Sequence, residues 1–435
     1  MQRASSLRPS VYPPSIAVVG RMLGVVLCAA AVLPPGETWI GGSGDAWAQQ
    51  DVPAESTRIQ SGFIDVDGGR LFYEEAGHGD CIVLVHDGLI HHEIWDAQFP
   101  VFAQTHRVVR YDRRGYGKSE SPEGQYSNIA DLRRVFEQLG IERAWLMGMS
   151  AGGGLCIDFT LAYPEMVTGL VLVGAVVSGF DYTQHMYTRG GRLTAAIYGD
   201  PEALRLYMVT TDPYEMAPSS TAARARARAL LEAYPGNADL EKHHLAVSPD
   251  TPALGRLGEI RVPALILVGE HDIPDVHAHA GAIDAGIPDA RRVVVSGAGH
   301  LVPLEAPASF LSEAQAFLRG AHFFATLAEE GVAAAVAEFA HSRQTHPDEA
   351  PFTEGRLNNE AYQRIQSGRV DEAIELFKLN VQAYPESWNV YDSLAEGYMT
   401  RGDTALAITY YEKSLELNPD NTGARQRIEE LRGGR

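Results

Sequence analysis

The 435-residue sequence has few cysteines and a shortage of positive charge. Its three cysteines, Cys28, Cys81 and Cys156, show no C-x-x-C spacing, which excludes a disulfide-stapled scaffold and the common cysteine-based metal and redox motifs. We expect them to be buried free thiols. Lys and Arg total 36 against 56 Asp and Glu, so the formal net charge is −20. Because nucleic acid and anionic membranes are polyanions, this acidic excess disfavours both as partners.

The apolar run near the N-terminus, residues 22–33, is too short to span a membrane. A spanning helix needs about twenty apolar residues. Three arginines precede the run and a small-x-small sequence follows at residues 46–48, which is the order of a secretory signal peptide. We therefore expect a cleaved leader over residues 1–48 and an exported protein, periplasmic or secreted, with no stable membrane span afterwards. An uncleaved N-terminal anchor is the alternative, because residues 16–19 lengthen the apolar stretch.

The next part of the chain alternates short apolar runs with helical patterns. With 45% hydrophobic residues the chain can bury a core, and its length indicates more than one domain. Runs nearly continuous in Val, Ile and Leu are typical of strands buried on both faces of a parallel sheet. The sequence therefore predicts an α/β domain over residues 49–320, interrupted by a helical lid at about 181–252. The expected strands are residues 81–85, 107–111, 144–147, 170–173, 264–268 and 292–295.

A repeat of 34 residues marks the C-terminal part, and this is the tetratricopeptide period. In such units a glycine permits the turn, a small alanine lets two helices approach, and a proline ends the second helix. A degenerate earlier copy lies at an offset of 38 residues. We predict an all-α tetratricopeptide-like domain over residues 321–435, with an unrelated helical bundle as the alternative. The recurring pairs are Gly368 and Gly402, Ala373 and Ala407, Ile374 and Ile408, Phe377 and Tyr411, and Pro385 and Pro419.

The clearest catalytic signal is a Gly-x-Ser-x-Gly sequence at residues 148–152. An apolar strand pattern precedes it and a helical pattern follows, so the glycines allow a sharp turn that exposes Ser150 at the carboxyl end of the strand. The next residue, Ala151, has its N–H at the start of the helix, where a developing oxyanion can be stabilised. We predict Ser150 as a nucleophile and Ala151 as an oxyanion donor.

A serine nucleophile needs a base, and the base needs an orienting carboxylate. Asp272 and His300 each follow an expected strand, so they reach the same edge of a parallel sheet as Ser150. We predict His300 as general acid and base and Asp272 as its carboxylate partner. Glu270 and Asp275 compete for the carboxylate role, and three unrelated loop residues are the remaining alternative.

Together these segments resemble the α/β-hydrolase superfamily, in particular its lid-bearing branch with a serine nucleophile. That branch includes esterases, lactonases, perhydrolases and carbon–carbon bond hydrolases. The resemblance implies an esterase-like enzyme that cleaves a carboxylic ester or related small acyl compound through an acyl-enzyme, without a cofactor or metal. Relatives with a nucleophilic aspartate are disfavoured because Ser150 stands at that position. The matching segments are His86-Asp87-Gly88 with Trp95, residues 110–119, the serine turn, residues 269–272 and Gly299-His300.

One position departs from the family pattern. The family usually has His-Gly followed by a variable residue whose N–H forms half of the oxyanion hole, but here Asp87 replaces the glycine. The resemblance makes Gly88 the second oxyanion donor. A carboxylate facing the hole would oppose the developing negative charge. We therefore expect Asp87 to point away, or to hydrogen-bond His91 or His92.

Other features suggest competing functions. Histidines cluster at residues 91–92, 243–244 and 277–279, without the i, i+4 spacing of zinc peptidases, so we expect surface or loop side chains there. Arg224, Arg226 and Arg228 are expected on a solvated helix face, with attraction of an acidic substrate as the alternative. Stacked helix pairs commonly bind peptides or proteins. The alternatives are therefore a scaffold whose repeats bind a partner or self-associate while the hydrolase fold is silent, or an iminopeptidase-like peptidase.

Overall fold

The computed structural model describes residues 58–184, 203, 220–234, 245–347 and 349–433. The expected leader lies outside these residues, as do large parts of the expected lid and Cys28. Within them, no helix is both long and apolar enough to cross a bilayer. Cys81 and Cys156 are buried free thiols, as expected.

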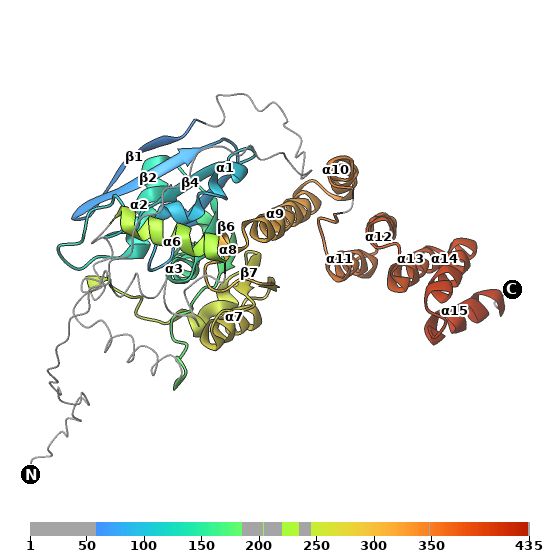
Figure 1. The fold of residues 1–435 in the computed structure, drawn as a ribbon. Coiled ribbons are helices and arrows are strands. Elements are labelled where there is room, and N and C mark those ends of the chain that lie inside the picture. Colours follow the sequence, from blue (N-terminus) through green and yellow to red (C-terminus); the bar gives the residue numbers. More distant parts are fainter. Residues whose placement is uncertain (1–57, 185–202, 204–219, 235–244, 348, 434–435) are drawn as a thin grey trace, which may run out of the picture. The chain divides into compact units, whose positions relative to one another are not determined.

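An eight-stranded sheet forms the centre of the first part of the chain (Figure 1). Its strand order is β1-β2-β4-β3-β5-β6-β7-β8, and the strands from β3 to β8 run parallel. All six expected strands are present, several of them extended by one to three residues, which confirms the predicted α/β class. They are β3 (Cys81–Val85), β4 (Arg107–Tyr111), β5 (Ala144–Met149), β6 (Val167–Val173), β7 (Ala264–Gly269) and β8 (Ala290–Val295).

Two strands were missed by the sequence prediction. β1 (Gln60–Val66) and β2 (Gly69–Ala76) form an antiparallel hairpin, and β2 pairs antiparallel with β4. The hairpin turn is Asp67-Gly68, with Gly68 at φ +71°, a sequence typical of tight turns between strands. The turn sequence indicates a hairpin, but β1 alternates between exposed and buried positions and so lacks the continuous apolar run that predicted the other strands.

The expectation of burial on both faces is wrong for β8. This strand lies at the edge of the sheet and pairs only with β7. Its residues alternate in exposure, and Val294 is 51% exposed. An edge strand of a sheet covered mainly at its centre keeps one face in solvent, so its apolar run does not imply full burial.

Helices cover both faces of the sheet through two separate cores. One core receives α2 (Asn128–Leu139), α3 (Ala151–Ala162) and α7 (Pro274–Gly286). The other receives α1 (Phe99–Phe102), α6 (Thr221–Ala233) and α9 (Pro307–Glu329). Short elements complete the domain: η1 (His92–Trp95), η2 (Pro164–Met166), η4 (Ala253–Glu259) and α8 (Val302–Glu305).

The remaining helices build the repeat region around a third core. The recurring alanines Ala373 and Ala407 are fully buried, and the aromatic positions Phe377 and Tyr411 are buried as well, so the 34-residue period marks the packing face. Gly402 ends a helix at φ +93°, where glycine is favoured. The boundary expected at residue 320 falls inside α9. The helices are α10 (Val332–Thr345), α11 (Glu354–Gln366), α12 (Val370–Ala383), α13 (Trp388–Arg401), α14 (Thr404–Leu417) and α15 (Thr422–Gly433).

Candidate active site

Ser150 stands on a sharp turn between β5 and α3. Its φ of 51° is the only positive φ of a non-glycine residue in the described part of the chain. A side chain at Gly152 would collide with the main-chain carbonyl of His86, and one at Gly148 would lie 2.6 Å from the Cys156 sulfur. Gly152 therefore lets the turn pack against the end of β3, and Gly148 lets α3 pack closely against β5, while Ser150 bears the backbone strain. Such strain is typical of functional positions.

Asp272 and His300 form a buried hydrogen-bonded pair. Asp272 Oδ2 lies 2.8 Å from His300 Nδ1, and Asp272 Oδ1 accepts the Ile273 N–H at 2.8 Å. The side chains are 1% and 2% exposed. Since the carboxylate accepts from Nδ1–H, it orients the ring and leaves Nε2 free to take a proton.

The structure brings His300 and Asp272 together but leaves the bond from His300 to Ser150 open. Within the described residues, His300 Nε2 is buried without a hydrogen-bond partner. Ser150 nevertheless lies close by, since its N–H donates to the Val173 carbonyl at 2.8 Å and a Cβ on the adjacent Gly174 would be 3.1 Å from His300 Cε1. Catalytic hydrogen bonds are often long without substrate and shorten in the complex.

The competing carboxylates have other partners. Glu270 accepts hydrogen bonds from Ser296 Oγ and Gly297 N–H, each at 2.9 Å. Asp275 accepts from the N–H and hydroxyl of Thr183. Only Asp272, among these three carboxylates, bonds to the His300 ring.

Opposing effects act on the pKa of His300. Burial by itself lowers the pKa, but the charge of Asp272 and its hydrogen bond raise it, and the charges of Asp87 and Glu305 add to this. The net pKa lies above the ordinary value of a histidine. The ring therefore needs a higher pH than usual before it can act as a base.

The two residues expected to donate to an oxyanion face each other. A Cβ on Gly88 would lie 3.6 Å from the Ala151 Cβ, so the loop after β3 meets the start of α3. The main-chain N–H groups of these two residues are therefore close enough together to be candidates for stabilising a tetrahedral intermediate.

Of the two expectations for Asp87, the hydrogen bond to His91 or His92 is wrong. Its Oδ1 accepts the N–H groups of Leu89 at 2.5 Å and Ile90 at 2.9 Å, and no hydrogen bond to His91 or His92 is formed among the described residues. A short carboxylate reaches the amides two and three residues ahead more easily than a distant ring. Burial raises the pKa of Asp87, although those two amides and the charges of His300 and Arg113 oppose the rise.

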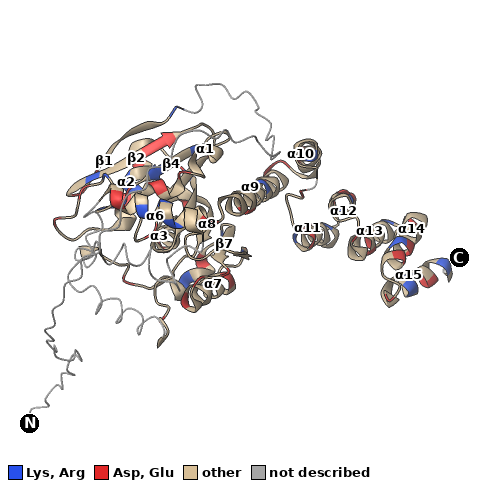
Figure 2. Cartoon of the chain, in the orientation of Figure 1, with Lys and Arg blue, Asp and Glu red and all other residues tan. Residues whose placement is uncertain are grey.

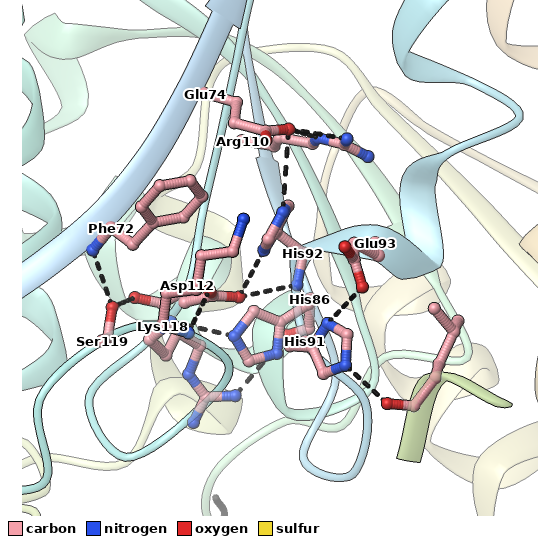
Figure 3. Close-up of polar contacts among 12 residues, drawn as sticks. Phe72, Glu74, His86, His91, His92, Glu93, Arg110, Asp112, Lys118 and Ser119 are labelled. Carbon is pink, nitrogen blue, oxygen red and sulfur yellow. Dashed lines mark hydrogen bonds and ion pairs between the residues drawn. The ribbon is translucent and has the colours of Figure 1, made fainter. Parts of the chain in front are cut away.

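The expectation of surface side chains is wrong for His91 and His92, because both are buried, at 4% and 1% exposure, although His91 does lie in the loop before η1. Figure 3 shows His92 between two carboxylates: its Nδ1 is 2.7 Å from Asp112 Oδ1, and its Nε2 is 3.7 Å from Glu74 Oε2. His91 Nε2 lies 2.8 Å from the Leu230 carbonyl of α6. Short loops and helices covering the sheet bury these rings, and sequence spacing does not reveal that.

His91, His92 and Asp112 are also the group in the described residues most like a metal site, because their ligand atoms lie within 4.8 Å of one another. Imidazole and carboxylate groups are common ligands. However, the two ring nitrogens without hydrogen bonds face different carboxylates, since His91 Nδ1 is 3.4 Å from Glu93 Oε2 and His92 Nε2 is nearest Glu74. We interpret the cluster as a charged network that connects α6 to the sheet.

The remaining histidine clusters and the arginines of α6 can also be compared with their predictions. The expectation of a surface or loop side chain is wrong for His279, which is buried on α7 and accepts the Val177 N–H, whereas residues 243–244 lie outside the described part. On α6, Arg226 pairs with Asp96 and Arg228 with Glu232, and both arginines are exposed, in agreement with a solvated helix face.

A cavity of about 310 Å³ lies beside Ala151. Its walls combine apolar side chains with a guanidinium group. Sequence reasoning did not single out Arg113, although the residue belongs to the run that carried the resemblance. The wall includes Arg113, Asn128, Leu155, Asp158, Val176 and Tyr182.

Comparisons with known proteins agree with the fold. A family model for the alpha/beta hydrolase fold matches residues 81–307, and a tetratricopeptide repeat model matches residues 388–421. The chain is 28% identical to a 2-hydroxy-6-oxo-6-phenylhexa-2,4-dienoate hydrolase of Comamonas testosteroni, over 59% of the chain and 93% of that protein. It is 31% identical to a 2-hydroxy-6-oxononadienedioate/2-hydroxy-6-oxononatrienedioate hydrolase of Klebsiella pneumoniae, over 58% and 92%.

Among solved structures, one described as an N-acyl homoserine lactone degrading enzyme superposes with a TM-score of 0.50 at 25% identity. The superposition covers 59% of this chain and 100% of the other. The similarity to relatives is therefore concentrated in the α/β part.

Proposed function

Because the chain belongs to the alpha/beta hydrolase fold family, we propose that it is a serine hydrolase that cleaves a carboxylic ester or related acyl compound. The observation that supports this most is the buried Asp272–His300 pair, at the same end of the sheet as the strained Ser150 turn. Acyl transfer requires a nucleophile, a base oriented by a carboxylate, and oxyanion donors, the role assigned here to the neighbouring residues Gly88 and Ala151.

In the proposed mechanism, Ser150 Oγ attacks the substrate carbonyl while His300 Nε2 takes its proton. The N–H groups of Gly88 and Ala151 stabilise the oxyanion, and Asp272 stabilises the imidazolium that forms. His300 then gives the proton to the leaving group, which leaves an acyl-enzyme on Ser150. Water, activated by the same ring, releases the acid.

Labelling with a fluorophosphonate probe tests this proposal. Wild type should be labelled and should hydrolyse p-nitrophenyl butyrate, and Ser150→Ala should lose both properties. The matched control removes an exposed hydroxyl of the same domain: Ser296→Ala should keep both labelling and hydrolysis. A folded wild-type protein that is neither labelled nor active would favour the silent scaffold.

A second candidate reaction is hydrolysis of an oxo-dienoate acid, because the two curated relatives carry such substrates in their names. The same Ser150, Asp272 and His300 would serve. Parallel assays with p-nitrophenyl esters and with 2-hydroxy-6-oxo-6-phenylhexa-2,4-dienoate decide between the two. A kcat/KM for the dienoate at least about tenfold above that for the best ester would favour the second reaction, since a tenfold ratio corresponds to about 1.4 kcal/mol of transition-state binding.

We further propose that the protein is exported after cleavage following Ala48, and that the repeat region binds a protein partner or a second copy of the chain. The basic and apolar order of residues 1–33 supports export. N-terminal sequencing of the protein from its native host should give Gln49 as the first residue. An intact N-terminus in the membrane fraction would instead support an uncleaved anchor.

A further inference from the structure

Two side chains hydrogen-bond to main-chain carbonyl groups of the loop that carries Gly88. The Asp87 carbonyl oxygen lies 2.7 Å from His86 Nδ1 and accepts a hydrogen bond from Arg113 Nη1 at 3.1 Å. The same Nη1 lies 3.5 Å from the His86 carbonyl. Two side chains therefore converge on the one peptide group that joins Asp87 to Gly88.

The hydrogen-bond partners determine the tautomer of His86. Its Nε2 accepts the main-chain N–H of Arg113 at 2.9 Å, so this nitrogen carries no proton. The proton is then on Nδ1, which donates to the Asp87 carbonyl. Burial lowers the pKa of His86 well below its usual value, and the charge of Arg113 adds to this, so the ring remains neutral.

Fixing this carbonyl also fixes the direction of the Gly88 N–H. A trans peptide is planar, so its N–H points opposite to its C=O, and the described residues contain no cis peptide. The next peptide is held as well, because Tyr116 Oη donates to the Gly88 carbonyl at 2.9 Å. The Asp87 side chain contributes from within the loop by accepting the Leu89 and Ile90 amides.

We propose that Arg113 and His86 are positioning residues that keep the Gly88 N–H directed at the oxyanion. This inference rests on the proposed serine hydrolase function. Without the two donors, the Asp87–Gly88 peptide loses the hydrogen bonds to its own carbonyl, so that it can more easily turn this carbonyl, rather than its N–H, toward the developing negative charge. The loop would then oppose the reaction that it should assist.

The same loop holds Asp87, which stands in place of the usual glycine. Its carboxylate Oδ1 accepts from the Leu89 and Ile90 amides, and its carbonyl is held by the His86 ring and Arg113. The other carboxylate oxygen, Oδ2, is buried without a hydrogen-bond partner among the described residues.

The test measures steady-state hydrolysis of p-nitrophenyl butyrate and the rate of fluorophosphonate labelling. Arg113→Met should lower kcat by about 10- to 100-fold, with KM within about twofold, and should slow labelling by a similar factor, because loss of one oxyanion donor costs about 100- to 1,000-fold. Arg113→Lys, which keeps a cationic donor, should recover part of the loss. Lys118→Met is the matched control and should leave kcat and labelling unchanged. It removes a cation of the same loop that lies over the Phe72 ring, 4.2 Å from its centroid, and not at the Asp87 carbonyl.

Tyr116→Phe provides a second variant that removes one hydroxyl and preserves the ring. It should lower kcat by about three- to tenfold without changing KM, because the Gly88 peptide loses one of its restraints, and it remains informative if Arg113→Met does not fold. A folded Arg113→Met protein and a Tyr116→Phe protein that both retain wild-type kcat and labelling would overturn the inference while the proposed function stands. Absence of Ser150-dependent hydrolysis in wild type would overturn both.

Discussion

At the scale of single residues, the charges of Asp87 and His300 each affect the pKa of the other group, an interaction that the sequence did not predict. Asp87 is buried, and its charge contributes to raising the pKa of His300. A general base must be neutral, so a raised pKa moves the onset of activity to higher pH. The acid side of the kcat/KM profile should therefore have its midpoint above about 6.5, the ordinary value for histidine.

Asp87→Asn should move that midpoint to lower pH. The amide oxygen of Asn can still accept the Leu89 and Ile90 N–H groups, but the negative charge that favours the imidazolium is removed. The measurement is the pH dependence of kcat/KM for an aryl ester. Glu270→Gln, which removes a carboxylate that is not among the groups raising the pKa of His300, should leave the midpoint in place. An unchanged midpoint in Asp87→Asn would show that Asp87 is uncharged or too far away.

Gly174→Ala should impair catalysis more than stability. A Cβ there would lie 3.1 Å from His300 Cε1 and 3.3 Å from Asp272 Oδ2, and φ is +51°. We expect kcat to fall at least about tenfold, since small misplacements of a catalytic group are costly. Gly140→Ala is the matched control, because Gly140 also has a positive φ, +62°, with no atom within 4 Å of the added Cβ. Equal activity losses in the two variants would contradict the argument.

At the scale of elements, a buried ion pair fastens α2 to the loop after β4. Arg114 Nε and Nη2 donate to the two carboxylate oxygens of Asp131, each at 2.8 Å, and the side chains are 3% and 7% exposed. Removing one member leaves the other buried and unpaired. The pair therefore helps to fix the position of this loop, which also carries Arg113 and Tyr116.

Asp131→Ala should lower the free energy of unfolding by about 3–5 kcal/mol, because it strands the Arg114 charge. Urea unfolding followed by circular dichroism measures the change. Glu137→Ala on the same helix removes an exposed pairing with Arg133 and Arg134 and should cost no more than about 1 kcal/mol. Comparable losses in the two variants would mean that Arg114 finds another partner or water.

At the scale of the whole molecule, α9 contributes to two cores. Phe310, Ala314 and Leu318 belong to a core of the sheet, whereas Phe323 and Leu327 belong to the core of the repeats. Acidic and basic residues alternate along the helices of both parts (Figure 2). The net charge of −20 is therefore not confined to one part of the chain.

A chain that ends after residue 330 should still hydrolyse a small aryl ester, with kcat/KM within about threefold of wild type, a difference of less than about 1 kcal/mol. This end point preserves all of α9, whereas a cut at residue 320 would divide the helix. The comparison is made on the folded, purified proteins, with thermal unfolding as the check of integrity. Loss of activity in a folded shortened chain would show that the repeats complete the site.

The sequence by itself determined the class of the fold and the place of the turn that carries Ser150. Continuous apolar runs specify buried parallel strands, a 34-residue period specifies the repeats, and Gly-x-Ser-x-Gly after a strand specifies the Ser150 turn, because each pattern depends on local geometry. Only the tertiary structure decided that Asp272, among three nearby carboxylates, bonds to His300, and that His91 and His92 are buried. It also decided that Arg113 and His86 hold the loop before Gly88. These contacts join segments distant in the chain, and a linear spacing does not encode which side chains meet.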